Sequence, residues 1–144
     1  MKETVNVSLK EEMTFEVEVN GHKIIIDADD KIGGGNKGPR PKPLMLAALG
    51  GCTAMDVVSI LRKMRIKFKA VNVIVDGELT EEHPRHFFKV HITYEFTGKD
   101  LPLEKLEKAV SLSQDRYCGV SYSYRKAMEM THEIKIIVPK MPKV

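Results

Sequence analysis

The chain has 144 residues, which suggests one domain, predicted to span 1–144. Apolar residues make up 42%, enough for a hydrophobic core, and the net charge of +3 is too small to indicate a nucleic-acid-binding protein by itself. The N-terminal MKETVNVSLK lacks the apolar segment of a secretory signal, so we expect a cytoplasmic protein.

The N-terminal region predicts an antiparallel meander followed by a loop. Apolar and polar residues alternate over 5–19, which is the period of a half-buried strand. Asn20-Gly21 predicts a hairpin turn, because both residue types tolerate positive φ, and 22–27 would form the returning strand. The Gly-rich segment 27–38 lacks the glycine spacing of a phosphate-binding loop. We expect either a mobile loop beside a functional site or a plain connector.

Residues 44–64 predict a long helix, after three prolines that exclude helix up to about residue 42. The segment is apolar on all sides, so we expect it to be buried on most faces. A membrane span is disfavoured because Asp56 lies within the apolar run, where a carboxylate is costly. A single chain of this size has too few residues to cover such a helix fully. A homodimer that packs two of these helices together would cover it.

The C-terminal half predicts five shorter elements. In chain order they are a strand, the clearest strand, an amphipathic helix, a helical turn and a last strand, at residues 71–75, 88–96, 102–117, 122–128 and 132–138. Asp76-Gly77 predicts a turn after the first of them, and Gly119 predicts the end of the amphipathic helix.

Cys52 and Cys118 are the two cysteines of the chain, one in the apolar helix and one at the end of the amphipathic helix. The sequence has no C-x-x-C pair, so it offers neither a thioredoxin motif nor a zinc knuckle. A structural disulfide is disfavoured in a reducing cytosol. The pair is therefore either inert or a reactive dithiol.

The segments around the two cysteines carry a family resemblance. They read GPRPKPLMLAALGGCTAMDVVSILRKM and, later, SLSQDRYCGVSYSYRKAMEMTHEI. Together they resemble the OsmC/Ohr family of osmotically induced and organic-hydroperoxide-resistance proteins, in the OsmC-like subgroup with a GPRP loop. The resemblance implies an α+β fold that forms an intertwined homodimer, in which antiparallel sheets wrap two long buried central helices.

The resemblance also implies a thiol-dependent peroxidase. Cys52 matches the cysteine that attacks the hydroperoxide, and Cys118 matches the cysteine that resolves the sulfenic acid as a disulfide. Organic hydroperoxides are the expected substrates, with hydrogen peroxide as a second candidate, and Leu49 and Met55 are expected contacts. An external dithiol would recycle the enzyme, with a lipoyl group as one candidate. No metal or organic cofactor is implied.

The chemistry requires a cation near the nucleophile. The thiolate is the reactive form, and burial in an apolar helix raises the pKa of a thiol. The family uses an arginine, which Arg40 in the GPRP loop matches, with Arg116 and Arg125 as second choices. Family members commonly carry an acid shortly after this arginine, where Lys42-Pro43 stands here. Asp56 is the candidate substitute as the partner of Arg40.

Two other readings stay open. The missing acid favours a catalytically weak OsmC-fold protein that senses redox state or binds a small molecule. The basic stretch 62–69 suggests nucleic-acid binding, but we favour solvated charges that complement the C-terminus of the helix. We therefore expect a homodimer with a hydroperoxide substrate and a dithiol reductant, and neither nucleic acid nor membrane as a partner.

Overall fold

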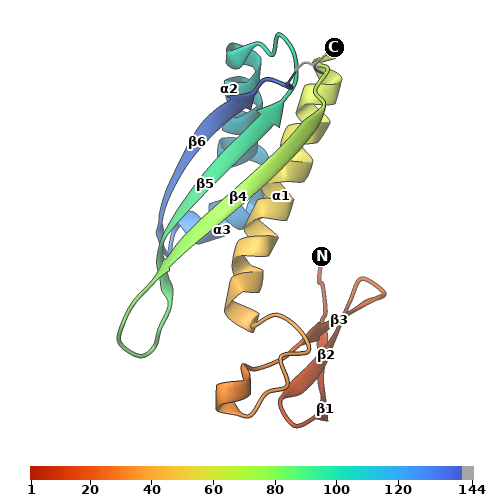
Figure 1. Ribbon diagram of the computed structural model, residues 1–144, viewed down its shortest axis with the longest axis vertical. Helices are drawn as coiled ribbons and strands as arrows, with labels where there is room; N and C mark the ends of the chain where they lie inside the picture. Colours follow the sequence, from red (N-terminus) through yellow and green to blue (C-terminus); the bar gives the residue numbers. More distant parts are fainter. Residues whose placement is uncertain (141–144) are drawn as a thin grey trace. The chain divides into compact units, whose positions relative to one another are not determined.

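The computed structural model describes residues 1–140, and Figure 1 labels their helices and strands. The chain forms two compact units, Met1–Met45 and a second that begins at Leu46. The chain contains α-helices together with two separate three-stranded sheets, so the predicted α+β class is confirmed. One domain over 1–144 stays a prediction, and its last four residues lie outside the described part.

The first unit contains the predicted meander. Strands β1 (Asn6–Glu11), β2 (Thr14–Val19) and β3 (His22–Ile26) pair antiparallel in that order. The Asn20-Gly21 turn has φ values of 49° and 76°, as a hairpin of this type requires. Several large apolar side chains of this unit are exposed, namely Val5, Val7, Leu9, Met13, Ile24 and Ile25.

The Gly-rich segment is organised around one carboxylate. Asp27 is only 2% exposed, and its Oδ2 accepts hydrogen bonds from the Thr14 hydroxyl at 2.9 Å and from the backbone N–H groups of Gly35 and Lys37 at 3.2 and 3.1 Å. Its Oδ1 accepts from the Ala28 N–H at 2.7 Å. A short 3-10 turn, η1 (Asp30–Ile32), lies inside the loop. The sequence predicted neither the turn nor this carboxylate.

Helix α1 (Pro41–Lys63) begins earlier than predicted. The expectation that prolines exclude helix up to about residue 42 was wrong, because Pro41 and Pro43 both lie in the first turn. N–H groups there have no partner within the helix, so proline loses nothing at these positions. The C-terminal end agrees with the predicted one to within a residue.

One stripe of α1 is buried and the opposite stripe is exposed. The buried residues are Leu49, Gly50, Thr53, Val57 and Leu61. The exposed ones are Ala47, Ala48, Gly51, Met55 and Ser59. The helix is long and apolar enough to cross a membrane, and 28% of its most apolar window is buried. The single chain covers one side of the helix, as expected for a chain of this size, and burial on most faces by a second copy stays a prediction.

The second unit contains a mixed sheet. Strands β4 (Ala70–Leu79), β5 (Phe87–Thr97) and β6 (Glu129–Ile137) lie in that order, with β4 antiparallel and β6 parallel to β5. The parallel pair corrects the expectation of purely antiparallel sheets. The predicted turn at Asp76-Gly77 was also wrong, because β4 continues through it. A Cβ at Gly77 would lie 2.7 Å from the ring of Phe87, so glycine permits this packing rather than a turn.

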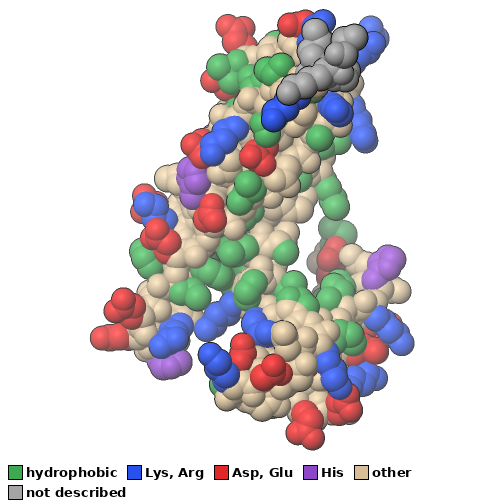
Figure 2. Space-filling model, in the orientation of Figure 1, with side chains coloured by type: hydrophobic (Ala, Val, Ile, Leu, Met, Phe, Trp, Pro, Cys, Tyr) green, Lys and Arg blue, Asp and Glu red, His purple; other side chains and the backbone are tan. Residues whose placement is uncertain are grey.

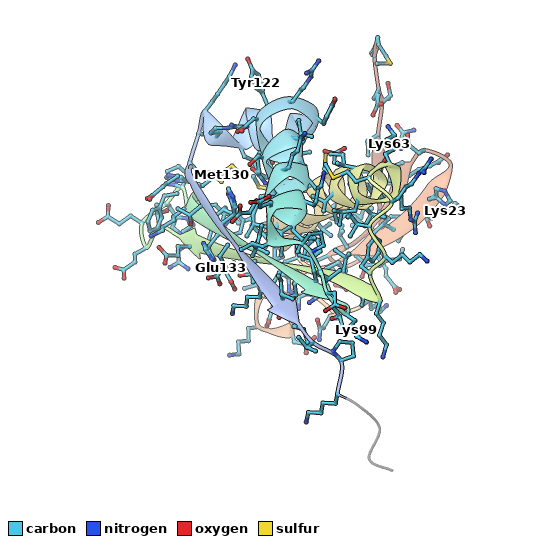
Figure 3. All side chains as sticks on the ribbon, turned by 90° about the horizontal axis from the view of Figure 1, so that it is seen from above. Lys23, Lys63, Lys99, Tyr122, Met130 and Glu133 are labelled. Carbon is cyan, nitrogen blue, oxygen red and sulfur yellow. The ribbon has the colours of Figure 1, made fainter. Side chains whose placement is uncertain are left out.

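Figures 1 and 3 show the helices of this unit on one face of its sheet. Helix α2 (Leu103–Leu112) continues into a π-helical turn, η2 (Ser113–Tyr117), and α3 (Gly119–Arg125) follows. Gly119 begins α3, which corrects its predicted role at the end of a helix. The core is formed by side chains from α1, β5 and α2, namely Leu49, Val57, Leu61, Val90, Ile92, Tyr94, Phe96, Leu106, Ala109 and Val110.

The surface carries both positively and negatively charged side chains. Figure 2 shows a face on which basic and acidic side chains are intermixed with hydrophobic ones. The basic residues in the last turn of α1 and directly after it are exposed, namely Arg62, Lys63, Arg65, Lys67 and Lys69. Their exposure fits the solvated charges that we favoured.

Candidate active site

The structure brings the two cysteines together. The Sγ atoms of Cys52 and Cys118 and a carboxylate oxygen of Asp56 all lie within 4.8 Å of one another. Both cysteines are free thiols; Cys52 is half-buried and Cys118 is 2% exposed. A disulfide is about 2.0 Å long, so a modest movement of the side chains would join the two sulfurs.

The π-helical turn positions Cys118. Its backbone N–H donates to the Ser113 carbonyl at 2.8 Å, and its own backbone is extended, with φ −77° and ψ 100°. The residue then caps the N-terminus of α3, where its Sγ accepts the Ser121 N–H at 3.3 Å. Single π-turns are often found at functional sites, because they redirect one side chain without ending the element.

Asp56 lies one turn after Cys52 on the same face of α1 and is held by a buried polar network. The Ser113 hydroxyl donates to Asp56 Oδ2 at 3.0 Å. The Thr53 hydroxyl pairs with Ser113 Oγ at 2.8 Å and with Tyr94 Oη at 2.6 Å. The Gln114 side-chain amide donates to the same Tyr94 oxygen. The network fixes the carboxylate beside the two thiols.

This network was not predicted from the sequence. Its members come from three different elements, so no local pattern joins them. One signal was available: Thr53 is a hydroxyl residue within an apolar run, and a buried hydroxyl needs a hydrogen-bond partner.

The described surroundings disfavour a thiolate at Cys52. Burial raises the pKa of the Cys52 thiol, and hydrogen bonding with Cys118 raises it too. Electrostatic repulsion from Cys118 and from the Asp56 carboxylate adds to the rise, while a backbone hydrogen bond from Val120 lowers the pKa. The net pKa of Cys52 lies above its ordinary value. A peroxidase therefore needs a further cation at this thiol.

Arg40 is held within the first unit by hydrogen bonds to uncharged acceptors among the described residues. Its Nη1 donates to the carbonyls of Asp27 and Gly38 at 3.2 and 2.7 Å, and its Nη2 donates to the Asn36 side-chain oxygen. All three acceptors are uncharged. The hydrogen bond described for Asp56 comes from Ser113, so its pairing with Arg40 stays a prediction, as does the role of Arg40 at the thiols.

The second-choice arginines have partners of their own. The Arg116 guanidinium lies over the Tyr117 ring, 5.6 Å from its centroid. Arg125 donates to the Gln114 carbonyl and forms an ion pair with Asp115 at 3.6 Å.

The expected substrate contacts lie in contrasting environments. Leu49 is fully buried in the core, and Met55 is 76% exposed. Their contact with a substrate stays a prediction.

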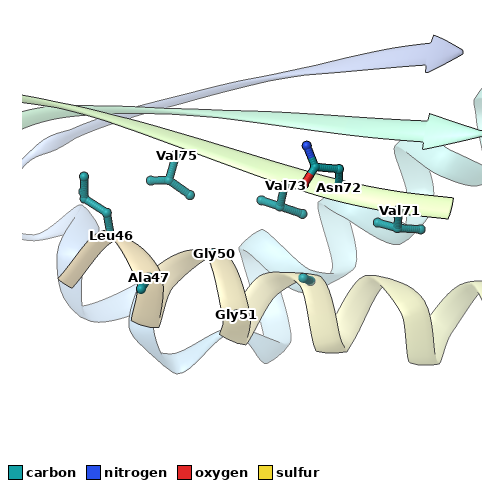
Figure 4. A pocket seen from close by; sticks show the side chains of 9 residues that line it. Leu46, Ala47, Gly50, Gly51, Val71, Asn72, Val73 and Val75 are labelled. Atoms are coloured by element: carbon teal, nitrogen blue, oxygen red, sulfur yellow. The ribbon is translucent and has the colours of Figure 1, made fainter. Parts of the chain in front are cut away.

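Two grooves flank α1. One, of about 470 Å³, adjoins the thiol site and is lined by Asp56, Ser59, Ile60, Lys63, Met64, Lys108, Leu112 and Tyr117. The other, of about 390 Å³, lies between α1 and β4, and Figure 4 shows Gly50 facing the valines of that strand. A Cβ at Gly50 would lie 3.0 Å from Val75 Cγ2, so glycine allows the helix to approach the sheet closely here.

Comparison with known proteins identifies the family. Residues 34–133 match the family model for OsmC-like protein. The chain is 38% identical to Protein YhfA of Escherichia coli (strain K12) over 118 residues, which cover 82% of this chain and 85% of that protein. A hypothetical protein from Aquifex aeolicus VF5 has a similar crystal structure, with TM-score 0.84, 27% identity and coverage of 97% of this chain and 99% of that chain.

A more distant structure shares the fold. It is an organic hydroperoxide resistance protein OsmC from Legionella pneumophila, with TM-score 0.69 and 16% identity, covering 94% of this chain and 97% of that one. These findings confirm the resemblance to the OsmC/Ohr family, while the subgroup with a GPRP loop stays a prediction. The chain belongs to the OsmC-like protein family.

Proposed function

We propose that the protein is a cysteine-based peroxidase that reduces organic hydroperoxides through Cys52 and Cys118. The observation that carries the proposal is the pair of free thiols within 4.8 Å of each other. The family supports it, since structures of the same fold from Legionella pneumophila and Bacillus subtilis are described as organic hydroperoxide resistance proteins.

In the first step the Cys52 thiolate attacks the terminal oxygen of the hydroperoxide. A sulfur–oxygen bond forms, the O–O bond breaks, and the alkoxide leaves as an alcohol after taking a proton. Sulfur is oxidised to a sulfenic acid and the peroxide is reduced by two electrons. An apolar surround, with Leu49 and Met55 as candidate contacts, would favour organic hydroperoxides over hydrogen peroxide.

In the second step the Cys118 thiol attacks the Cys52 sulfenic acid. A disulfide forms and water leaves, which protects Cys52 from further oxidation. A dithiol reductant, with a lipoyl group as one candidate, then returns two electrons and two protons to the disulfide. The cycle needs no metal or organic cofactor. A cytoplasmic location is part of the proposal, because a reducing compartment keeps both thiols free.

Arg40 is the proposed cation for the thiolate. Its guanidinium is bound only by uncharged acceptors among those described, so its charge remains available to an anion. A cation near Cys52 would offset the effects that raise the pKa of this thiol. The proposal leaves open whether this cation is Arg40 of the same chain or Arg40 of a second copy.

The active form is proposed to be a homodimer. The exposed stripe of α1 combines small residues with Met55, and a second copy of the helix would cover it. A membrane is a poorer partner, because Asp56 and Thr53 lie on this helix and one stripe of it already packs on the sheet.

The test is hydroperoxide consumption with a dithiol reductant. The proposal expects steady turnover in the wild type and loss to the uncatalysed rate in Cys52→Ser. Cys118→Ser should consume about one equivalent of peroxide and then stop. Ser123→Ala, an exposed hydroxyl on α3, is the control and should retain full turnover. Full activity in Cys52→Ser would refute the mechanism.

The second candidate is a redox sensor or small-molecule binder with weak turnover. Two observations favour it: the raised pKa of Cys52 and the absence of the family acid at Lys42-Pro43. It expects a single oxidation by peroxide without recycling by any dithiol. Steady-state turnover with a lipoyl compound would remove this candidate.

A further inference from the structure

The thiol site has the donor atoms of a metal site. Two sulfurs and one carboxylate oxygen lie within 4.8 Å of one another, on side chains that are half-buried or buried. Zn–S bonds are about 2.3 Å and Zn–O bonds about 2.0–2.2 Å, which separates tetrahedral ligands by roughly 3.5–3.8 Å. The three atoms would need to draw together by about 1.3 Å at most, which side-chain rotation allows.

Each of the three donors also has a supporting hydrogen bond. Cys118 Sγ accepts the Ser121 N–H at 3.3 Å, and Cys52 accepts a backbone hydrogen bond from Val120. Asp56 Oδ2 accepts the Ser113 hydroxyl at 3.0 Å. N–H donors to thiolates and hydroxyl donors to a carboxylate are the interactions that orient ligands around a bound metal. The arrangement is therefore supported before any ion is present.

The electrostatics of the cluster also favour a cation. Full ionisation of the three groups would bring three negative charges within 4.8 Å of one another. A divalent ion would offset their mutual repulsion, because it stabilises each thiolate directly. Sulfur donors with one oxygen suit a borderline-soft ion such as Zn²⁺ and suit Mg²⁺ or Ca²⁺ poorly.

We infer that reduced Cys52 and Cys118, together with Asp56, bind one Zn²⁺ ion per chain. Binding releases the two thiol protons to solvent, and the fourth position is left for water. The bound ion occupies the same sulfurs that the proposed peroxidase oxidises, so it would act as a reversible inhibitor rather than a cofactor. Zinc binding itself does not require that the protein turn over peroxide.

Titration of the reduced, metal-free protein with Co²⁺ tests the inference. Thiolate coordination should give charge-transfer bands in the near ultraviolet and the visible bands of a four-coordinate ion, saturating at about one ion per chain. Zn²⁺ should displace the cobalt. In weak buffer at a pH at which both thiols are protonated, about two protons should be released per Zn²⁺ bound.

Variants assign the ligands. Cys52→Ser and Cys118→Ser should each abolish the charge-transfer bands, and Asp56→Asn should weaken Zn²⁺ binding about tenfold or more. Asp76→Asn, an exposed carboxylate on β4, is the matched control and should bind as the wild type does. Zinc binding that releases no protons, or that survives both cysteine substitutions, would overturn the inference. If Asp56→Asn fails to fold, the cysteine variants and the proton count still decide.

The outcome is separable from that of the proposed function. Peroxide consumption is measured in the presence of a chelator and zinc binding in the absence of peroxide. Turnover without zinc binding would refute the metal site alone. Zinc binding without turnover would refute the peroxidase alone.

Discussion

At the scale of single residues, Asp56 is the carboxylate that lies beside both thiols of the candidate site. It lies beside both sulfurs, and its negative charge helps to raise the pKa of the Cys52 thiol. The family resemblance led us to expect Asp56 as a partner that steadies Arg40. The described geometry gives it a different neighbour, Ser113, and a direct electrostatic effect on the thiol.

Asp56→Asn should therefore make Cys52 more reactive at neutral pH. Removing the negative charge lowers the pKa of the thiol, so the thiolate fraction rises and the pH profile of its reaction moves to lower pH. The measurement is alkylation of Cys52 by iodoacetamide between pH 6 and pH 10, roughly spanning ordinary thiol pKa values, in a Cys118→Ser background. We expect a several-fold faster reaction near neutral pH. An unchanged or slower reaction, with Asp76→Asn behaving as the background, would contradict this effect.

The cysteine pair could be predicted from the sequence, but its neighbours could not. The absence of a C-x-x-C pair and the family motifs led to Cys52 and Cys118 together. The network of Thr53, Tyr94 and Ser113 depends on how a helix, a strand and a second helix pack, which no periodicity records.

At the scale of elements, this network joins α1, β5 and the π-turn. The Tyr94 oxygen is shared by Thr53 and Gln114 and is fully buried. Buried polar groups that lose a partner are left without water to replace it, so the network should be sensitive to single substitutions.

Tyr94→Phe should destabilise the protein by about 1–3 kcal/mol, because it leaves Thr53 and Gln114 without this partner while keeping the ring. The measurement is the free energy of unfolding in urea. Tyr122→Phe is the matched control, since Tyr122 is 61% exposed, and it should change the stability by well under 1 kcal/mol. Equal stability of both variants would show that the network contributes little.

The loop around Asp27 gives a second prediction at this scale. Burial raises the pKa of Asp27, but hydrogen bonds from Lys37, Thr14, Ala28 and Gly35 outweigh it, so the pKa is lowered. A lowered pKa stabilises the fold above the unfolded value of about 4 and stops doing so as the pH falls through the folded pKa.

Asp27→Asn should loosen this loop at neutral pH, because an amide nitrogen would face N–H donors in place of an acceptor oxygen. Limited proteolysis should cut segment 28–40 faster in the variant than in the wild type, and the difference should shrink as the wild type is acidified through the folded pKa. Asp29→Asn, an exposed neighbour, is the control. Equal cleavage of Asp27→Asn and the wild type at neutral pH would contradict the role of the carboxylate.

Most elements were predictable, and the errors have physical reasons. Alternation located the strands, and apolar length located α1. The start of α1 was missed because prolines are harmless in a first turn, and Gly77 was read as a turn when it serves close packing against Phe87. The parallel pairing of β6 was missed because alternation fixes a strand but not its direction.

At the scale of the whole molecule, the exposed stripe of α1 is the feature that most requires a partner. The sequence predicted a helix that is apolar all round, and the single chain buries one stripe of it. The first unit also has exposed apolar residues, which likewise favour a partner. An apolar residue looks the same in the sequence whether it is buried within its own chain or against a second copy. The partner that covers these exposed residues could therefore not be predicted from the sequence.

Met55→Lys should disrupt the proposed dimer, since a charge at the centre of an apolar interface is costly unless it is paired. Sedimentation equilibrium should give about twice the chain mass of 16.3 kDa for the wild type and a shift toward the single-chain mass for the variant. Glu107→Lys, an exposed change on α2, is the control and should stay dimeric. A wild type that sediments as a single chain would refute the proposed assembly.

The most direct test of the central claim is a single oxidation of the reduced, metal-free protein. One equivalent of cumene hydroperoxide is added, and peptides are mapped by mass spectrometry without reduction. We expect a Cys52–Cys118 disulfide within one chain, with two thiols lost for each hydroperoxide consumed. Unchanged peroxide with both thiols intact, or oxidised Cys52 that never joins Cys118, would contradict it.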